Sequence, residues 1–275
     1  MIIWIASYPK SGNTWMRVFL DNLSKFGDDR ADINKLGIDN FDARYLFDSL
    51  TGWESSELSL DEINRLRTCA QDSLDPNSFF LYKVHEAFVH PLSGLPLISA
   101  KASFGAVYIV RNPLDVAVSF ANHLGRGIDR AIRLMSLKGA HLGMVAQVPQ
   151  PMGTWSSHVN SWVDAPDVKV HVIRYEDMLA DPVRTFTSVC HFTGLSEDDD
   201  AIARAIENSR FEALQEQEQK NGFRETFTQG RSFFRKGKAG TWREVLTPAQ
   251  VDRIIKSHHD TMKRFGYIGS DGRPV

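Results

Sequence analysis

The stretch that decides the fold is Ile2-Ile3-Trp4-Ile5-Ala6, followed at once by Ser7-Tyr8-Pro9-Lys10-Ser11-Gly12-Asn13-Thr14. The first five residues are apolar and mostly β-branched or aromatic, a composition that favours a buried strand. Pro9 and Gly12 then mark a tight loop. The apolar residues that follow at helical spacing are Trp15, Val18, Phe19, Leu23 and Phe26. The chain therefore opens with a strand, a loop and a helix.

Three later apolar runs predict further strands, at residues 79–82, 107–110 and 168–173. Each is bounded by polar or turn residues, and the stretches between them are long enough for helices. Because the runs are continuous rather than alternating, they favour strands of a parallel sheet that is buried on both faces. The sequence therefore predicts an α/β fold of three layers, with a central parallel sheet and helices on both faces.

Capping residues mark the start of two helices. Ser59 and Glu62 have the spacing of a capping box. Thr247-Pro248-Ala249-Gln250 supplies an N-cap, a proline at the first helical position and a glutamine at the third. Apolar residues between positions 251 and 265 share one face of the second helix, which we expect to end at Gly266.

The composition limits the class of protein. The chain has 275 residues, of which 42% are hydrophobic, and it contains no internal repeat or low-complexity linker, so we expect a single domain over residues 1–275. With 32 Lys+Arg and 34 Asp+Glu the net charge is -2, which argues against a nucleic-acid partner and against binding to an anionic membrane surface.

Apolar runs and cysteines indicate the compartment. No apolar run is long enough to span a bilayer, and no basic region precedes the first one, so we expect no membrane insertion. Cys69 and Cys190 lie far apart and form no metal-spaced pair, which excludes a disulfide framework or a zinc ribbon. We expect a cytoplasmic protein with no bound metal.

The loop after the first strand resembles the phosphate-binding P-loop GxxxxGK[ST] in its length and in its final Gly12 and Thr14. Ser7 stands in place of the first glycine and Asn13 in place of the lysine, while Lys10 lies three residues earlier. Backbone N–H groups at a helix start still form an anion cradle, and Lys10 adds a positive charge. The pattern predicts a P-loop-type fold with a phosphate site; the alternative is an ordinary turn with a solvated lysine.

Two other segments carry charged side chains that suit a phosphate-bearing ligand. Arg111-Asn112-Pro113-Leu114-Asp115 follows the strand at 107–110, and Ser119 falls on the same helical face as Asp115. Ligands bind at this edge of open α/β sheets. The basic side chains between positions 231 and 243, with no acidic residue between them, are Arg231, Arg235, Lys236, Lys238 and Arg243. Gly237 and Gly240 interrupt them, which suits close approach to a phosphate. The alternatives are a common helix start for the first segment, and a solvated basic loop or a weak nucleic-acid patch for the second.

These three pieces, in this order, resemble the sulfotransferases that use 3′-phosphoadenosine 5′-phosphosulfate (PAPS). The family's PKSGxTW loop stands here as residues 9–15, its RNPxDxxxS block as residues 111–119 and its RKGxxGxW block as residues 235–242. The similarity extends to Tyr175-Glu176-Asp177-Met178 and to Gly153-Thr154-Trp155, and covers residues 2 to about 265. In the family these blocks hold the 5′-phosphosulfate and the 3′-phosphate.

The resemblance implies site residues by position. The family's catalytic histidine follows a strand as Lys-x-His, which here is Lys83-Val84-His85. We expect His85 to act as general base, Lys10 to stabilise the leaving group and Lys83 to neutralise the sulfuryl oxygens. The expected contacts to PAPS are Lys10, Ser11, Gly12, Asn13, Thr14, Trp15, Arg111, Ser119, Tyr175, Ser209, Phe211, Arg235, Lys236 and Gly237. The other histidines, His123 and His141 among them, are expected to be surface or packing residues.

The expected reaction moves a sulfuryl group from PAPS to a hydroxyl or amine, leaving adenosine 3′,5′-bisphosphate (PAP), and needs no metal. The rival readings are a P-loop kinase that uses ATP and a nucleotide-binding module without catalysis. A kinase needs a lysine where Asn13 stands, and it needs an acidic magnesium ligand after a strand, where Arg111 follows 107–110 and only Asp177 could serve.

The acceptor stays open among phenols, steroids, sugars, lipids and peptide natural products. Residues 121–153 and 215–235 show no sustained period, so we expect acceptor-pocket or lid loops there, and the length of the first favours a large or flexible acceptor. A homodimer also stays open. The family's KxxxTVxxxE dimer segment corresponds to Arg243, Thr247, Pro248 and Asp252, and so departs from the pattern.

Overall fold

The structure is a computed structural model that describes residues 1–25, 29–143, 145–226 and 232–275. Its main sheet has five parallel strands in the order β2-β3-β1-β4-β7. The strands are β1 (Ile2–Ser7), β2 (Asp39–Asn40), β3 (Phe80–Val84), β4 (Ser103–Val110) and β7 (Val170–Arg174). The expected parallel sheet is therefore confirmed. Phe26 and Arg231, named in the sequence patterns, lie outside the described residues.

Both faces of the sheet are buried, as the continuous apolar runs predict. Along β1, Trp4 faces one core together with Tyr108 of β4, whereas Ile5 faces the other core together with Ile109. All four side chains are fully buried. Because alternate residues of a strand point to opposite faces, a strand between two helical layers must be apolar at every position.

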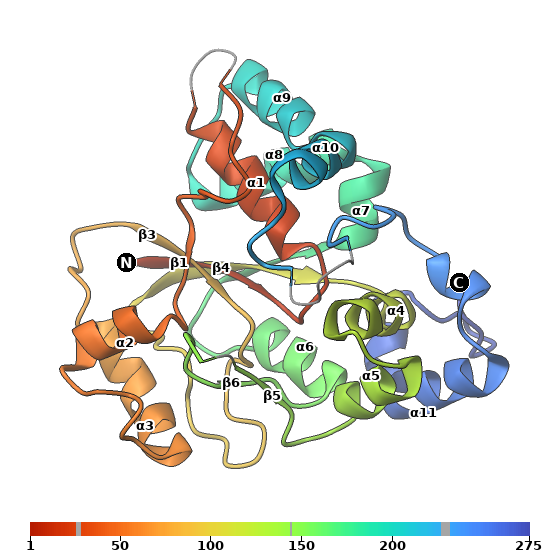
Figure 1. The fold of residues 1–275 in the computed structure, drawn as a ribbon, viewed down its shortest axis with the longest axis horizontal. Helices are drawn as coiled ribbons and strands as arrows, with labels where there is room; N and C mark the ends of the chain where they lie inside the picture. The colour runs from red at the N-terminus through yellow and green to blue at the C-terminus, as the bar shows by residue number, and fades with distance from the viewer. Residues whose placement is uncertain (26–28, 144, 227–231) are drawn as a thin grey trace.

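Helices form the two outer layers, which Figure 1 shows above and below the sheet. The helices on one side are α1 (Asn13–Leu23), α7 (Tyr175–Ala180), α8 (Pro182–Thr193), α9 (Asp199–Asn208) and α10 (Phe211–Asn221). Those on the other side are α2 (Arg44–Thr51), α3 (Leu60–Asp72), α4 (Pro113–Leu124), α5 (Ile128–Met135), α6 (Trp155–Val163) and α11 (Pro248–Arg264). This arrangement confirms the three-layer α/β fold.

Side-chain caps set the helix starts. Ser59 and Glu62 form both bonds of a capping box at α3, and Thr247 and Gln250 do so at α11. Helix α4 begins with Pro113 after an Asn112 cap, whose side-chain oxygen accepts the N–H of Leu114. These bonds satisfy N–H groups that the first helical turn leaves without partners.

Two segments expected to be irregular are more regular than their sequences indicate. Between residues 121 and 153, α4 continues to Leu124, α5 follows, and β5 (His141–Leu142) pairs with β6 (Gln150–Pro151). Helix α5 has only eight residues and follows Gly127, so its apolar residues repeat over too few helical turns to be recognised in the sequence. Helix α10 buries only Leu214, and a helix with so narrow an apolar stripe resembles a polar loop in sequence.

Two smaller observations complete the fold. Phe79, which we expected to begin a strand, is 64% exposed and precedes β3. In the parts of the chain that the structure describes, no helix has both the length and the apolar character needed to cross a bilayer.

Candidate active site

A cavity of about 530 Å³ opens at the carboxyl ends of β1, β3 and β4, where the predicted motifs come together. The predicted site residues that line it are Lys10, Gly12, Asn13, Thr14, Trp15, Lys83, His85, Arg111, Ser119, Tyr175, Phe211, Arg235, Lys236 and Gly237. These residues run from Lys10 to Gly237, more than 220 positions apart in the chain, and the parallel topology brings them to one edge of the sheet.

The loop between β1 and α1 has a special backbone. Lys10 has a φ of 66° and Gly12 a φ of 105°, both in the left-handed region. A Cβ on Gly12 would lie 2.7 Å from the ring of Tyr175, so only glycine fits there. For Lys10 this conformation costs about 1–2 kcal/mol, and it is held because Arg111 Nη1 donates to its carbonyl oxygen at 2.9 Å. Strained residues of this kind cluster at ligand sites.

Asn13 shows why this loop is not a kinase P-loop. Its side-chain amide donates to the carbonyl oxygen of Ile5 at 2.9 Å and to Ser7 Oγ at 3.3 Å, so it braces the loop from β1. The position that carries the phosphate-binding lysine of a kinase is therefore occupied by a structural side chain. Gly12 caps α1 without a side-chain bond, which leaves the first N–H groups of the helix to an anion.

Arg111 connects the loop to the basic segment. Besides the carbonyl of Lys10, its guanidinium reaches the carbonyl oxygen of Lys238 at 3.4 Å and lies 4.0 Å from the centre of the Tyr175 ring. Its Nε has no partner among the described residues. Arg111 is thus oriented by two motifs and one aromatic ring, with a donor left for a ligand.

Asp115 anchors the basic segment on α4, a role that the sequence does not reveal. Its buried carboxylate accepts from Gly240 N at 2.7 Å, Thr241 Oγ1 at 3.0 Å and Trp242 N at 3.0 Å. These bonds set the start of the 3-10 helix Thr241–Glu244. Asp115 therefore acts on a second motif, 125 residues away along the chain.

Phe211 and Gly237 are brought into contact. A Cβ on Gly237 would lie 2.4 Å from the ring of Phe211, and Gly237 has a φ of 57°. The glycine is needed so that the basic segment can pass over the ring at the start of α10. Lys236 lies beside them on the cavity wall and pairs with Glu244 at 2.9 Å.

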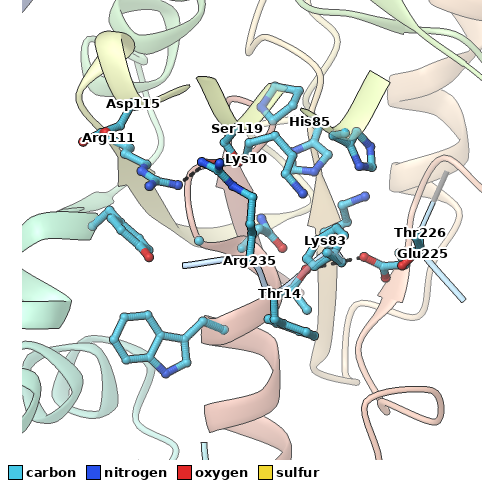
Figure 2. A pocket seen from close by; sticks show the side chains of 18 of the residues that line it. Lys10, Thr14, Lys83, His85, Arg111, Asp115, Ser119, Glu225, Thr226 and Arg235 are labelled. Carbon is cyan, nitrogen blue, oxygen red and sulfur yellow. Dashed lines mark hydrogen bonds between the residues drawn. The ribbon is translucent and has the colours of Figure 1, made fainter. Parts of the chain in front are cut away.

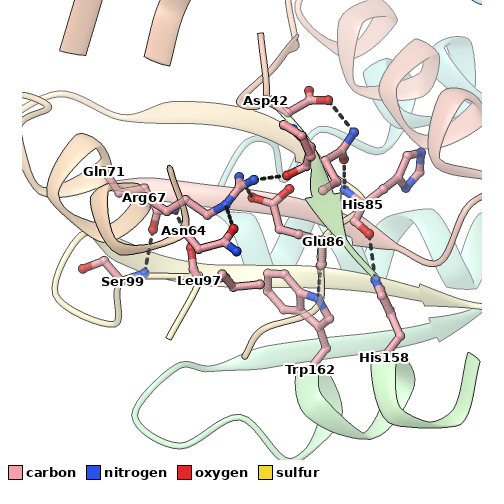
Figure 3. A network of polar contacts seen from close by, with 12 residues as sticks. Asp42, Asn64, Arg67, Gln71, His85, Glu86, Leu97, Ser99, His158 and Trp162 are labelled. Carbon is pink, nitrogen blue, oxygen red and sulfur yellow. Dashed lines mark hydrogen bonds and ion pairs between the residues drawn. The ribbon is translucent and has the colours of Figure 1, made fainter. Parts of the chain in front are cut away.

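Backbone bonds hold His85 on both sides. Its N–H donates to Gln150 Oε1 at 3.1 Å, and its carbonyl lies 3.0 Å from His158 Nε2 (Figure 3). The Nδ1 of His158 is in turn 2.9 Å from the Tyr108 hydroxyl. The ring Nδ1 lies 2.8 Å from the carbonyl oxygen of Ser7. Since a carbonyl only accepts, Nδ1 carries the proton and Nε2 of the neutral ring keeps a lone pair.

A buried network supports the segment that follows His85. Arg67 of α3 pairs with Glu86 at 3.4 Å, and it donates to Asn64 and to the carbonyl of Pro149. The Gln150 amide in turn donates to the buried carboxylate of Asp42. The loop that carries Pro149 and Gln150 is therefore fixed to both α3 and His85.

Burial changes the ionisation of the two most reactive groups. Desolvation lowers the pKa of His85 well below its usual value, and the nearby Lys83 charge lowers it further. The ring is therefore neutral near pH 7. Desolvation also lowers the pKa of Lys10 to about 7, although the carboxylate of Glu225 opposes this. Perturbed pKa values of this kind gather at functional sites.

Two predicted contact residues do not line the cavity. Ser209 is fully buried and donates to the carbonyl of Ile206 at 3.1 Å, so its contact to PAPS stays a prediction. Ser11 is fully buried behind the loop, and its Oγ has no partner in the described part of the chain. A buried hydroxyl without a partner is unusual in a folded protein, so the contact of Ser11 with PAPS also stays a prediction.

The sequence patterns did not identify several residues of the cavity wall. His123 and His141, expected to be surface or packing residues, both line the cavity. His123 packs edge-on against Phe233 with ring centres 5.9 Å apart. Glu225 also lies on the wall and pairs with the buried Arg17 of α1 at 2.7 Å. None of these residues belongs to a motif, so only the fold could reveal them.

Known proteins provide an independent comparison. The family model described as the sulfotransferase domain matches residues 2–266. Mouse sulfotransferase 2A6 is 26% identical over 266 residues, which are 95% of this chain and 84% of that protein. Human sulfotransferase 2A1 is 24% identical over 265 residues, 94% of this chain and 83% of that protein.

Solved structures share the fold. Mouse sulfotransferase SULT7A1, complexed with PAP, has a TM-score of 0.62 at 22% identity and covers 99% of this chain and 87% of its own. Retinol dehydratase, in complex with androsterone and the inactive cofactor PAP, has a TM-score of 0.63 at 20% identity and covers 95% and 80%. Since the family model spans nearly the whole chain, the resemblance seen in the motifs is confirmed, and this protein belongs to the sulfotransferase family.

Proposed function

We propose that this sulfotransferase holds PAPS in the cavity of about 530 Å³ and transfers the sulfuryl group to a hydroxyl or amine of a small-molecule acceptor. The observation that carries the proposal is the orientation of His85. Its Nδ1 is committed to the carbonyl of Ser7, which leaves Nε2 as a base on the cavity wall. The cationic side chains on the same wall are Lys10, Lys83, Arg111, Arg224, Arg235, Lys236 and Lys238.

The chain fits a nucleotide with two anionic ends. At one end the uncapped start of α1, the Ser11 hydroxyl and Lys10 suit a 5′-phosphosulfate. At the other end Arg111 keeps its Nε unpartnered among the described residues, beside the basic segment that Asp115 anchors. Phosphate groups are recognised by such combinations of guanidinium, ammonium and backbone N–H groups.

PAPS supplies an activated sulfuryl group, and the protein supplies position, charge and a base. His85 takes the proton of the acceptor's hydroxyl or amine as its oxygen or nitrogen bonds to sulfur. The bond between sulfur and the 5′-phosphate oxygen breaks, and Lys10 stabilises the charge that develops on that oxygen. Lys83, only 7% exposed, lies two residues before His85 and neutralises the sulfuryl oxygens.

The acceptor enters beside His85. The cavity wall includes Leu124, His141, Leu142, Gln147 and Gln150, all from the segment expected to form the acceptor pocket, and Gln150 bonds the backbone of His85. This placement supports an acceptor bound by residues 121–153, with an alcohol or amine group directed at His85. Phenols, steroids, sugars, lipids and peptide natural products stay candidates.

The test is transfer of label. The protein is incubated with PAPS carrying labelled sulfate, or with labelled ATP, in EDTA, against a panel of phenols, sterols, sugars and amines. We expect transfer from PAPS without added metal and none from ATP. Transfer from ATP that EDTA abolishes would support the kinase instead, and tight PAP binding with no transfer to any acceptor would support the non-catalytic module.

Two further properties belong to the proposal. We expect a cytoplasmic location, which suits the free Cys69 and the buried free Cys190. A homodimer stays a prediction, and light scattering on the purified protein at several concentrations tests it. A constant monomer mass over that range would contradict it.

A further inference from the structure

Glu225 occupies the anion-binding part of the site. Its Oε1 pairs with Arg17 Nη1 at 2.7 Å. The hydroxyl of Thr14 donates to its Oε2 at 3.4 Å (Figure 2). Arg17 is 1% exposed, and its Nε and Nη2 donate to the carbonyl oxygen of Ile38. A carboxylate of the chain itself therefore lies at the P-loop helix, in the place where a phosphate group of a ligand is expected.

The carboxylate is charged. Burial on its own raises the pKa of Glu225, but the positive charges of Arg17 and Lys83 outweigh it and lower that pKa to about 2. A second anion brought to Thr14 would be repelled by this charge, and more strongly than in bulk water because the Glu225 side chain is only 22% exposed.

A second side chain occupies another expected contact of the donor. The Lys10 ammonium lies 3.3 Å from the centre of the Phe233 ring. Phe233 is held there because its N–H donates to Glu218 of α10 at 2.6 Å, and the next N–H, of Phe234, donates to the same carboxylate at 2.9 Å. Lys10 and Thr14, two of the P-loop side chains that suit an anion, are thus both engaged by side chains of the protein.

We propose that Glu225 is an internal competitor of the nucleotide: it holds Thr14 while the site is empty, and it must give up that bond when the 5′-phosphate binds. The inference rests on the proposed function, because it takes the P-loop to be the 5′-phosphate site. It makes Glu225 a residue that sets the affinity for PAPS and PAP, with no part in the transfer of the sulfuryl group.

A role opposite to that of a competitor would change the Kd for PAP in the opposite direction. If Glu225 were a latch that closes over bound nucleotide through Arg17, removal of its charge would weaken nucleotide binding. A competitor predicts tighter binding, because the phosphate no longer has to displace a charged group. The sign of the change therefore separates the two roles.

The experiment is calorimetric titration of PAP, at pH 6 and so below the pKa of Lys10, into the wild type and into Glu225→Gln, a variant that keeps an oxygen to accept from Arg17 but loses the charge. We expect the Kd for PAP to fall about fivefold to tenfold, a gain of about 1–1.4 kcal/mol. Glu216→Gln is the matched control, since it makes the same charge change at an exposed position of α10. Its Kd should equal that of the wild type.

Two additional variants keep the test decisive. If Glu225→Gln fails to fold, Phe233→Leu removes the ring over Lys10 and should also tighten PAP binding. In a Thr14→Val background the gain from Glu225→Gln should shrink, because the hydroxyl for which the two anions compete is gone.

The results distinguish a failure of the competitor role from a failure of the proposed function. Weaker or unchanged PAP binding in Glu225→Gln, beside normal binding by the wild type, would overturn the competitor and leave the proposed function in place. No binding of PAP by the wild type would overturn the proposed function, and the inference with it.

Discussion

His85 owes its orientation to a backbone carbonyl rather than to a carboxylate, because its Nδ1 lies 2.8 Å from the carbonyl oxygen of Ser7. A carbonyl fixes the tautomer without placing a negative charge beside the anionic donor. Burial keeps the ring neutral by lowering its pKa, so Nε2 is unprotonated near pH 7. The surroundings of His85 therefore suit the general-base role that we propose for it.

Replacement of this side chain separates catalysis from binding. We expect His85→Ala to lower kcat by about 100-fold or more, while the Kd for PAP changes little, because the proposed function places the ring against the acceptor and not against the nucleotide phosphates. His191→Ala, at an exposed position of α8, is the control and should keep full activity. A collapse of PAP binding in His85→Ala would assign the residue a structural role instead.

Lys10 gives the site a pH dependence. In the empty site its pKa is about 7, and a bound anion favours the charged form and raises that pKa. Above pH 7 the protein must therefore take up a proton as PAP binds, so affinity falls as the pH rises from 7 to 9. The charged groups that act on Lys10 are Glu225, Arg111, Glu218 and Lys83.

Calorimetry over this pH range, in buffers of different ionisation enthalpy, measures both the affinity and the proton uptake. Lys10→Arg keeps the positive charge at every pH in the range, so its affinity for PAP should be nearly constant. An equally steep loss of affinity in Lys10→Arg would show that another group titrates.

Motif matching does not reveal the link between helix α4 and the basic segment of residues 232–243. Three donors from residues 240–242 converge on the Asp115 carboxylate, which is 1% exposed. An amide in its place would leave at least one of these donors without an acceptor, at a cost of about 1–3 kcal/mol. The anchored segment carries Arg235 and Gly237 into the cavity.

We therefore expect Asp115→Asn to weaken PAP binding about tenfold and to lower the melting temperature, because an unpaired buried donor costs free energy. Once PAP is saturating, kcat should stay near the wild-type value. Asp61→Asn, at an exposed position of α3, changes the same charge far from the cavity and serves as control. Normal PAP affinity in Asp115→Asn would mean that the segment holds its place without this anchor.

The elements also show what sequence patterns can predict. The strands β1 and β4 and the caps of α3 and α11 are local patterns, and the structure confirms them. Helix α5 could not be predicted, because eight residues between glycine-containing turns give too few periods. Its place depends on packing against α4 and α11, which is tertiary information.

The difference between local patterns and tertiary information also applies to the cavity. The place of Lys10, Arg111 and Arg235 on its wall was predictable because each of them lies in a contiguous motif. Glu225 and His123 were not, because no neighbouring residue in the sequence marks them, and only the folded chain places them on the cavity wall. Sequence patterns therefore predicted most of the motif residues that line the cavity, and the fold added wall residues such as Glu225 and His123.

At the scale of the molecule we infer that residues 1–275 form one domain, since one sheet carries both helical layers. Thermal unfolding should show one cooperative transition, with equal calorimetric and van't Hoff enthalpies. PAP should raise the midpoint, because a ligand that binds only the folded state stabilises it. Two separate transitions, of which PAP shifts only one, would divide the chain into two domains.

The central claim is that segments far apart in the chain form one site for an adenosine nucleotide with two anionic ends. Calorimetric titration of the wild type with PAP tests it most directly, at two temperatures so that a heat near zero at one of them cannot hide binding. We predict saturable binding of one PAP per chain, much tighter than that of ATP. No heat with PAP at either temperature, or equal affinity for ATP, would contradict the account.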